Sequence, residues 1–294
     1  MHSLWILAAE FFYAFTALCI KLSSADIGAL EAVFYRSVFA CVLVAVPALA
    51  KGGSLLTPLW KAHLFRAVAG TTSQTIWILT LPLMPLAMNM TLTNTMPLYM
   101  AASILCFCLI KKENVPWKVL SMVALGFIGV LLVLRPQGGV DIIPFLGALS
   151  CGFFTMLAFS TIKYVGNRGE PAWRIVFYYT AFGTIYGLLG TVFLEDGFVD
   201  FTPENLMYIC GIGFSAMGAQ ICNAKGYGKG NLLLNSTLQY SVIVFSEIFG
   251  FFVLSETLSV AEAFGIAIIC AAAIFATYFT KQWQKSVKNK PSWS

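Results

Sequence analysis

The sequence predicts an all-α membrane protein in which ten transmembrane helices form two inverted five-helix repeats. Three observations support this fold class. First, 59% of the 294 residues are hydrophobic and only 11% are charged, whereas charged residues make up about 25% of a typical soluble domain. Second, apolar runs of helix length recur along the whole chain, each enough to cross about 30 Å of hydrocarbon. Third, motifs of the first half return in the second half at a nearly constant spacing.

The repeated motifs are clearest in the segments 89–113 and 235–256. Both segments open with Asn-x-Thr-Leu at an offset of 146 residues, and both close with a glutamate. The upstream residues Gln74 and Gln220 keep the same offset. Because a constant spacing of several motifs indicates internal repeats, we interpret the chain as a duplication.

The duplication predicts a first repeat over residues 1–138 and a second over residues 139–294, the latter ending in a short basic tail. Five helices per repeat is an odd number, so the second repeat must enter the membrane from the opposite side. Inverted repeats of this kind are typical of secondary transporters, whose substrate sites lie between the two halves near the middle of the bilayer.

The boundaries of the ten helices follow from hydropathy, with Gly, Pro and charged residues marking the ends of each run. In the first repeat, charged residues or glycines close most runs, such as Lys21 after the first and KKE after the fourth. In the second repeat, an acidic segment and a glycine-rich turn separate the middle helices. The predicted helices span residues 4–22, 29–50, 65–82, 87–110, 117–134, 142–163, 172–194, 205–224, 231–254 and 260–280.

The basic residues predict the orientation of these helices. If the connections alternate between two faces, every Lys and Arg except Lys21, Arg36 and Arg135 falls on one face, including Arg66 beside the loop 51–63. By the positive-inside rule, this face and both termini are cytoplasmic. The net charge of +5 therefore reflects membrane topology, and we expect no nucleic-acid partner.

The signature residues of the chain resemble a known transporter superfamily. Helix 1 begins with aromatic residues and ends in Lys21, Arg36 lies early in helix 2, Pro97 lies within helix 4, and a glutamate follows helices 4 and 9. This pattern, from about residue 4 to 280, resembles the drug/metabolite transporter superfamily and in particular its EamA-type bacterial members. The resemblance implies an inner-membrane carrier with a central cavity lined mainly by helices 1, 3, 4, 6, 8 and 9. Helix 9 has no proline matching Pro97, so the sequence does not predict a matching kink there.

Polar residues inside the spans are the candidates for function, because a charged side chain at mid-helix costs about 2.5–3.5 kcal/mol on insertion scales. The carboxylates of Glu10 and Glu247 are the strongest candidates. A low dielectric favours their protonated form, which suits them for proton coupling or for binding a cation. Polar side chains at helical spacing on helices 3, 4, 8 and 9 would line a solvated cavity. The substrate or coupling candidates are Glu10, Gln74, Trp77, Asn89, Thr93, Gln220, Asn223, Asn235, Gln239 and Glu247.

Each candidate also has a structural interpretation. Asn, Gln and Thr in membrane helices often hydrogen-bond to neighbouring helices and serve only packing. We interpret Arg36 as structural, because near the start of its helix it could pair with Glu31 or reach the membrane interface. Pro97 is likewise a structural candidate, as the source of a kink.

The sequence favours a carrier over an enzyme. The only histidines are His2 near the terminus and His63 in a predicted loop, so no membrane-embedded catalytic pair, metal-ligand cluster or cofactor motif is present. A channel usually shows a ring of like residues or a selectivity loop. We therefore predict a non-enzymatic secondary active transporter that works by alternating access, with no catalytic residues, metal or cofactor.

The predicted substrate is a small organic metabolite that is amino-acid-like, amphipathic or cationic, with export favoured by the resemblance. The partners are this solute and the lipid bilayer, with proton or ion coupling as a further expectation. The chain could be a monomer or a homodimer. The alternatives are an uptake carrier or exchanger for a nucleotide-derived or other metabolite such as S-adenosylmethionine and, more remotely, a channel or structural membrane protein.

Overall fold

The computed structural model describes residues 2–24, 26–80, 83, 92–112, 115–134, 142–195, 197–253 and 260–288, and every regular element within these ranges is a helix. The all-α fold class is therefore confirmed. In chain order the helices are α1 (Leu4–Ser23), α2 (Ala29–Ala50), α3 (Trp60–Thr80), α5 (Met96–Lys111), α6 (Trp117–Leu134), α7 (Ile142–Gly166), α8 (Ala172–Leu194), α9 (Pro203–Lys229), α10 (Leu232–Gln239), α11 (Ser241–Val253) and α12 (Val260–Lys288).

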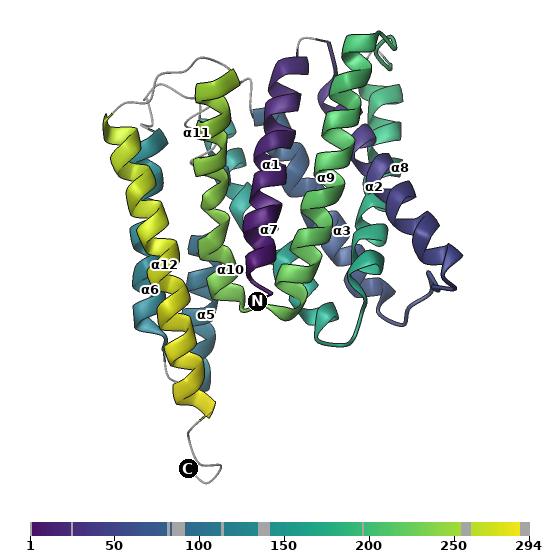
Figure 1. Cartoon of the computed structure of the whole chain (residues 1–294). Coiled ribbons are helices and arrows are strands. Elements are labelled where there is room, and N and C mark those ends of the chain that lie inside the picture. The colour runs from purple at the N-terminus through teal and green to yellow at the C-terminus, as the bar shows by residue number, and fades with distance from the viewer. Residues whose placement is uncertain are drawn as a thin grey trace.

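The packing of these helices has the symmetry of two related halves. Helix α1 packs on α9 and α3 packs on α7, so each of these pairs joins one half to the other. In the two halves, α1, α2 and α3 correspond to α7, α8 and α9. The α1–α9 pair therefore corresponds to the α7–α3 pair, and the α2–α9 contact corresponds to the α8–α3 contact. In three further pairs, a helix packs on its own counterpart in the other half: α2 on α8, α6 on α12 and α5 on α10. The α6–α12 pair stands at one side of the bundle, and α2 and α8 stand at the other (Figure 1).

The spans run alternately up and down (Figure 1), with α10 and α11 together in one span, so the two halves are inverted. Helix α1 begins and α12 ends at the same end of the bundle (Figure 1). Five reversals of direction separate α5 from α10, so these corresponding helices run in opposite directions. The predicted boundary between the repeats, at residues 138 and 139, lies outside the described residues and stays a prediction.

Seven stretches of the described chain are long and apolar enough to cross a membrane, and one of them joins α10 and α11. Helices α5 and α6 provide shorter apolar segments. Helix α3 falls below the hydropathy of a typical span because it carries polar residues such as Arg66, Ser73 and Gln74, all of which are buried inside the bundle. The chain is thus a multi-pass membrane protein whose most polar described helices face inward.

Several predicted boundaries are wrong: α12 continues to Lys288 rather than ending at residue 280, and two further differences affect the cavity and the packing of the halves. Helix α3 begins at Trp60 rather than at residue 65, so His63 is a buried helical residue rather than a loop residue, and Arg66 is buried within the helix rather than at its start. Helix α9 continues to Lys229 through the glycine-rich segment that we predicted to be a turn. The glycines allow close packing there: a Cβ on Gly226 would lie 2.4 Å from Ile6 Cδ1. The segment is therefore helical because it contacts a neighbouring helix, which no local pattern in the sequence indicates.

Predicted helix 9 breaks at Tyr240 between α10 and α11, although it has no proline that matches Pro97. Around the break, the Ser241 hydroxyl donates to the Leu238 carbonyl at 2.7 Å, and the hydroxyls of Ser236 and Thr237 donate to the Leu233 carbonyl. Hydroxyls that bond to carbonyls of the preceding turn bend helices. A proline is therefore not needed for the break.

The span of α5 breaks at the corresponding place. The chain turns at Asn94 and Thr95, immediately before Met96 begins α5. The Thr95 hydroxyl donates to the Leu92 carbonyl at 2.7 Å, which reproduces the Ser241–Leu238 bond at the same 146-residue offset. Pro97 is the second residue of α5, so it starts this helix instead of kinking its middle. The repeated break is a feature of both halves.

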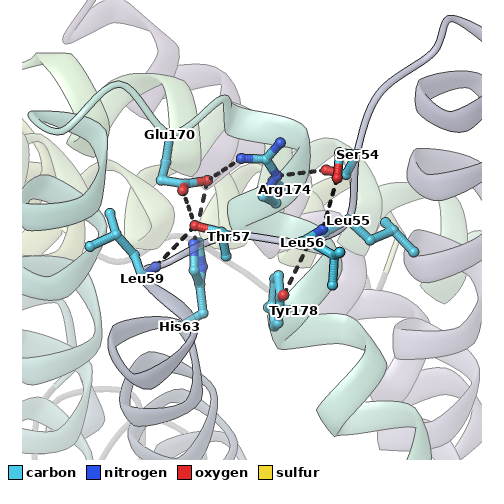
Figure 2. A network of polar contacts seen from close by, with 9 residues as sticks. All are labelled: Ser54, Leu55, Leu56, Thr57, Leu59, His63, Glu170, Arg174 and Tyr178. Carbon is cyan, nitrogen blue, oxygen red and sulfur yellow. Dashed lines mark hydrogen bonds and ion pairs between the residues drawn. The ribbon is translucent and has the colours of Figure 1, made fainter.

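A polar cluster holds the loop after α2 against the start of α8, and we name it the Glu170 cluster (Figure 2). The Glu170 carboxylate accepts hydrogen bonds from Thr57 and, at 3.0 Å, from Arg174. Arg174 also donates to the Ser54 carbonyl at 2.9 Å, and Tyr178 donates to the Leu55 carbonyl at 2.9 Å. The cluster therefore ties a loop of the first half to a helix of the second.

The opposite end of the α2–α8 pair has a matching contact, which we name the Glu195 cluster. The Glu195 carboxylate at the end of α8 accepts from the backbone N–H groups of Leu30 and Glu31 at 2.8 and 3.1 Å. Carboxylates are stabilised at helix N-termini, where N–H groups lack partners. Glu31 in turn accepts from the Val199 N–H at 2.8 Å. In both clusters the loop that follows one helix binds to the start of its partner helix.

We expect the end of the bundle that holds both termini to be cytoplasmic, from the distribution of basic residues. A green fluorescent protein fused to the C-terminus should fluoresce, and an alkaline phosphatase fused there should be inactive. A phosphatase fused after Phe201, in a chain truncated at that point, should be active. The opposite pattern of activities would reverse the orientation.

The substitution Glu170→Gln should destabilise the folded protein by about 2 kcal/mol, the scale of hydrogen bonds to charged groups. Although burial raises the pKa of Glu170, the hydrogen bonds from Thr57 and Arg174 and the nearby positive charges outweigh it and leave the pKa below its usual 4.5. A carboxyl group with a lowered pKa in the folded state stabilises the protein above about pH 4.5 and loses this contribution at lower pH.

The midpoint of thermal unfolding of the detergent-purified protein at pH 7, 5 and 4 checks this prediction. The variant should unfold at a lower temperature at pH 7, and the difference from the wild type should shrink at pH 4. The exposed carboxylate of Glu204 provides the control substitution Glu204→Gln, which should have a smaller effect. Equal midpoints of the wild type and Glu170→Gln at pH 7 would contradict a stabilising role for the cluster.

Candidate functional site

A cavity of about 160 Å³ lies between the two halves, near the middle of the helices that line it. A site for one water molecule needs roughly 10–15 Å³ on the same measure, so the cavity has room for several waters or a small organic solute. Both repeats contribute side chains to it. The lining residues are Glu10, Tyr13, Thr16 and Ala17 of α1, Arg36 of α2, Arg66, Gly70, Ser73, Gln74 and Trp77 of α3, Thr93 and Asn94 before α5, Cys151, Thr155, Ala158 and Phe159 of α7, Tyr179 of α8, Gln220 of α9, Gln239 of α10, and Val242 of α11.

Three charged residues line this cavity, although each is nearly inaccessible to solvent. Glu10, Arg36 and Arg66 are exposed by only 2%, 5% and 3%. Within the described residues, Glu10 forms no ion pair with either arginine, and its Oε1 atom has no hydrogen-bond partner. Buried charges are costly when they are not compensated. Three ionisable side chains therefore share one cavity, and none of them contacts an opposite charge within the described residues.

Arg66 is held in place by residues from the second repeat. Its Nη2 atom donates to Gln220 Oε1 at 2.9 Å, and its guanidinium carbon lies 3.7 Å from the centre of the Tyr179 ring. Gly70, one helical turn after Arg66, allows this ring to approach, because a Cβ there would lie 2.9 Å from Tyr179 Cε2. Helices α3, α8 and α9 thus fix the guanidinium group at the cavity wall.

Two further tyrosine contacts complete this wall. The Tyr179 hydroxyl donates to Gln74 Oε1 at 2.6 Å. The Tyr13 hydroxyl oxygen accepts from Gln220 Nε2 at 2.9 Å and from Asn223 Nδ2 at 3.2 Å. Gln220 therefore bridges Arg66 and Tyr13, so side chains of α1, α3 and α9 belong to one hydrogen-bonded network.

The internal duplication indicates where Glu10 lies relative to the broken spans. Glu10 and Gly152 correspond between the repeats at the 142-residue offset. A Cβ on Gly152 would lie 2.3 Å from Thr95 Oγ1, so this position contacts the break before α5. Helix α1 packs likewise against α10 and α11, and Glu10 shares the cavity with Gln239 beside that break. One half thus has a carboxylate where the other has a glycine.

The structure brings six of the ten substrate or coupling candidates together around the cavity, namely Glu10, Gln74, Trp77, Thr93, Gln220 and Gln239. Asn223 lies just behind them and bonds to Tyr13. Asn235 is buried away from the cavity wall, where it donates to the Gly226 carbonyl at 2.9 Å. Glu247 is partly buried on α11 and does not line the cavity. Asn89 lies outside the described residues.

Arg36 does not pair with Glu31, the partner that its structural interpretation suggests, within the described residues. Glu31, the proposed partner, accepts from the N–H groups of Gly28 and Val199, and no ion pair joins it to Arg36 within the described chain. Instead Arg36 lines the central cavity. The resemblance implies a cavity lined mainly by the predicted helices 1, 3, 4, 6, 8 and 9. In the structure, α2 and α8, which are the predicted helices 2 and 7, also line it through Arg36 and Tyr179.

Arg66, Tyr13 and Tyr179 are cavity residues that the sequence analysis missed. Arg66 lies at the start of the predicted helix 65–82, a position typical of a cytoplasmic charge, whereas α3 begins at Trp60. Its spacing to Gln74 and Trp77, at about two and three helical turns, was the signal that could have placed it on the same face. The two tyrosines lack such a signal, since aromatic residues are common throughout membrane helices.

Comparison with known proteins identifies relatives of this chain. Residues 1–135 match the family described as "EamA-like transporter family". Two proteins named "Uncharacterized transporter", from Helicobacter pylori strains 26695 and J99, are each 25% identical to this chain over 290 residues and cover 92% of it and 93% of their own length. A solved structure titled "Crystal structure of protein" is 17% identical, covers 96% of this chain and 98% of its own, and has a TM-score of 0.81, which shows a shared fold.

Proposed function

We propose that the chain is a secondary active carrier of a small organic solute, because residues 1–135 match the EamA-like transporter family and two relatives are named transporters. The observation that carries this proposal is a cavity that charged and polar side chains of both inverted halves line together. Substrate sites of such carriers lie near the membrane midplane between the repeats. No chemical step is proposed for any residue of the cavity.

Alternating access is the mechanism that this arrangement favours. The pairs α1–α9 and α3–α7 exchange places when the halves are exchanged, so a movement that opens one end of the cavity has a symmetric counterpart at the other end. Broken spans beside the cavity supply places where such movement is absorbed, at Asn94–Thr95 and at Tyr240. Hinges of this kind are commonly a few residues at the ends of helices.

The charges of the cavity guide the choice of solute. Glu10 can bind a cationic group or carry a proton, and the aromatic rings of Tyr13 and Trp77 offer apolar and cation–π contacts. An amino-acid-like or amphipathic cationic metabolite suits these groups. A nucleotide-derived solute such as S-adenosylmethionine, taken up or exchanged, is the alternative that carries the same charges. Export remains our preferred direction, on the family resemblance.

We place the carrier in a bacterial inner membrane with both termini in the cytoplasm, from the distribution of basic residues. Its partners are the solute, the lipid bilayer and a proton or ion whose gradient drives transport. A monomer would contain the complete cavity, because all lining residues come from one chain. A homodimer is compatible with the same mechanism.

Substitution of Glu10 tests the coupling role. In proteoliposomes, Glu10→Gln should reduce proton-driven transport at least tenfold and remove its dependence on pH, because the amide keeps the shape of the side chain but does not titrate. Glu247→Gln should have the smaller effect, since Glu247 does not line the cavity. The exposed Glu204 again provides the control, and Glu204→Gln should transport as the wild type does.

A thermal-shift screen of the purified carrier against a metabolite library would identify the solute for these assays. If Glu10→Gln transports with the rate and pH profile of the wild type, Glu10 is a packing residue. If only Glu247→Gln loses coupling, the proton site lies on α11. If the purified chain moves no compound that binds to it, the proposal of a carrier is wrong.

A further inference from the structure

Arg66 combines burial, a fixed position and unused hydrogen-bond donors. The residue is 3% exposed, and its Nη2 atom is occupied by Gln220. Its Nε and Nη1 atoms are buried and have no hydrogen-bond partner in the described chain. An arginine inside a membrane protein that serves packing normally pairs with a carboxylate or with backbone carbonyls. Arg66 instead lines the cavity.

The directions of the hydrogen bonds add a second unused donor. A guanidinium group can only donate, so Gln220 must present its Oε1 atom to Arg66 and its Nε2 atom to Tyr13. Asn223 also donates to Tyr13. The Tyr13 oxygen therefore accepts twice, and its own hydrogen has no acceptor within the described residues.

A third donor comes from the neighbouring contact. Gln74 uses its Oε1 atom to accept from Tyr179, and its Nε2 atom is buried without a partner in the described chain. Arg66, Tyr13 and Gln74 all line the same cavity. The cavity wall therefore has an excess of donors, which a bound anion would satisfy.

The positive charges point in the same direction. Arg36 lines the cavity with Arg66, and neither arginine forms an ion pair within the described residues. Glu10, the carboxylate of the lining, forms no ion pair with either arginine within the described residues, so two guanidinium groups line one cavity without a negative charge in contact. A bound anion would offset the cost of burying them.

We propose that Arg66 binds the carboxylate group of the transported solute through the N–H groups that the described chain leaves without an acceptor, with Tyr13 and Gln74 as additional donors. This inference rests on the proposed function only in taking the cavity as the solute site. A planar guanidinium edge matches a carboxylate through two parallel hydrogen bonds, which lysine cannot reproduce. Gln220 and Tyr179 are positioning residues, because they hold the guanidinium group from behind. A purely cationic solute would leave Arg66 unpaired.

Matched probes test the inference on the full-length purified protein. Each set contains an L-amino acid, the amine that lacks its carboxylate and the acid that lacks its ammonium group, such as phenylalanine, phenethylamine and 3-phenylpropanoate. Sets built on alanine, leucine, methionine and tryptophan extend the range of side chains. Binding is measured by isothermal titration calorimetry, and thermal shifts rank the sets first.

In the wild type, at least one carboxylate-bearing probe should bind ten or more times more tightly than its matched amine. The substitution Arg66→Gln should reduce this ratio to about two or less, and Arg66→Lys should reduce it partly because the charge remains. Arg168 provides a matched control, since it also lies over a tyrosine ring, Tyr164, at 3.5 Å but is exposed. Arg168→Gln should leave the ratio unchanged.

Arg66→Lys keeps the test decisive if Arg66→Gln does not fold. The inference is overturned if no carboxylate-bearing probe binds, if the amines bind as tightly as their matched amino acids, or if the ratio survives both substitutions. Tighter binding of the acid than of the amino acid supports a carboxylate site for a plain anion. If a probe binds through Arg66 but shows no flux in proteoliposomes, the carrier function fails while the Arg66 site stands.

Discussion

The cost of placing charged side chains in a membrane-spanning bundle is the constraint on which this structure depends. Glu10, Arg36 and Arg66 lie on three different helices, and each is turned inward to a shared cavity. A position facing lipid would cost each of them several kcal/mol. The pairs α1–α9 and α3–α7, each of which joins the two halves, pack around these groups. The cost of exposing charges to lipid therefore accounts both for the packing of the two halves and for the cavity between them.

The polar side chains of the cavity wall form a supporting network rather than a set of separate groups. Gln220 joins Arg66 to Tyr13, and Tyr179 joins Arg66 to Gln74. Because each donor or acceptor is fixed by its neighbour, the groups that remain unused have defined directions. A cavity of this kind is prepared for a solute with charged groups before the solute arrives, which lowers the cost of ordering the site on binding.

The two inverted halves are alike in their backbone and unlike in their charges. Both contain a span broken beside the cavity, with Thr95 and Ser241 making the same hydroxyl-to-carbonyl bond. Glu10 corresponds to Gly152, however, so the carboxylate occurs in one half alone. The end clusters differ too, since Glu170 binds an arginine and Glu195 binds backbone N–H groups. A symmetric frame suits alternating access, and asymmetric charges allow the two ends and the solute site to respond differently.

The sequence by itself determined the membrane class, the approximate positions of the spans and the duplication, because hydropathy, charge distribution and repeated motifs are local properties. It also identified Glu10, Gln74 and Gln220, since polar residues within apolar runs are conspicuous. Only the tertiary structure decided that Arg66 lines the cavity and that α9 stays helical through its glycines. It also decided that Glu31 accepts a hydrogen bond from the Val199 N–H and forms no ion pair with Arg36 in the described chain. These features depend on contacts between residues more than a hundred positions apart, such as Arg66 with Gln220. No local pattern records which partner a side chain meets when two halves of a bundle pack together.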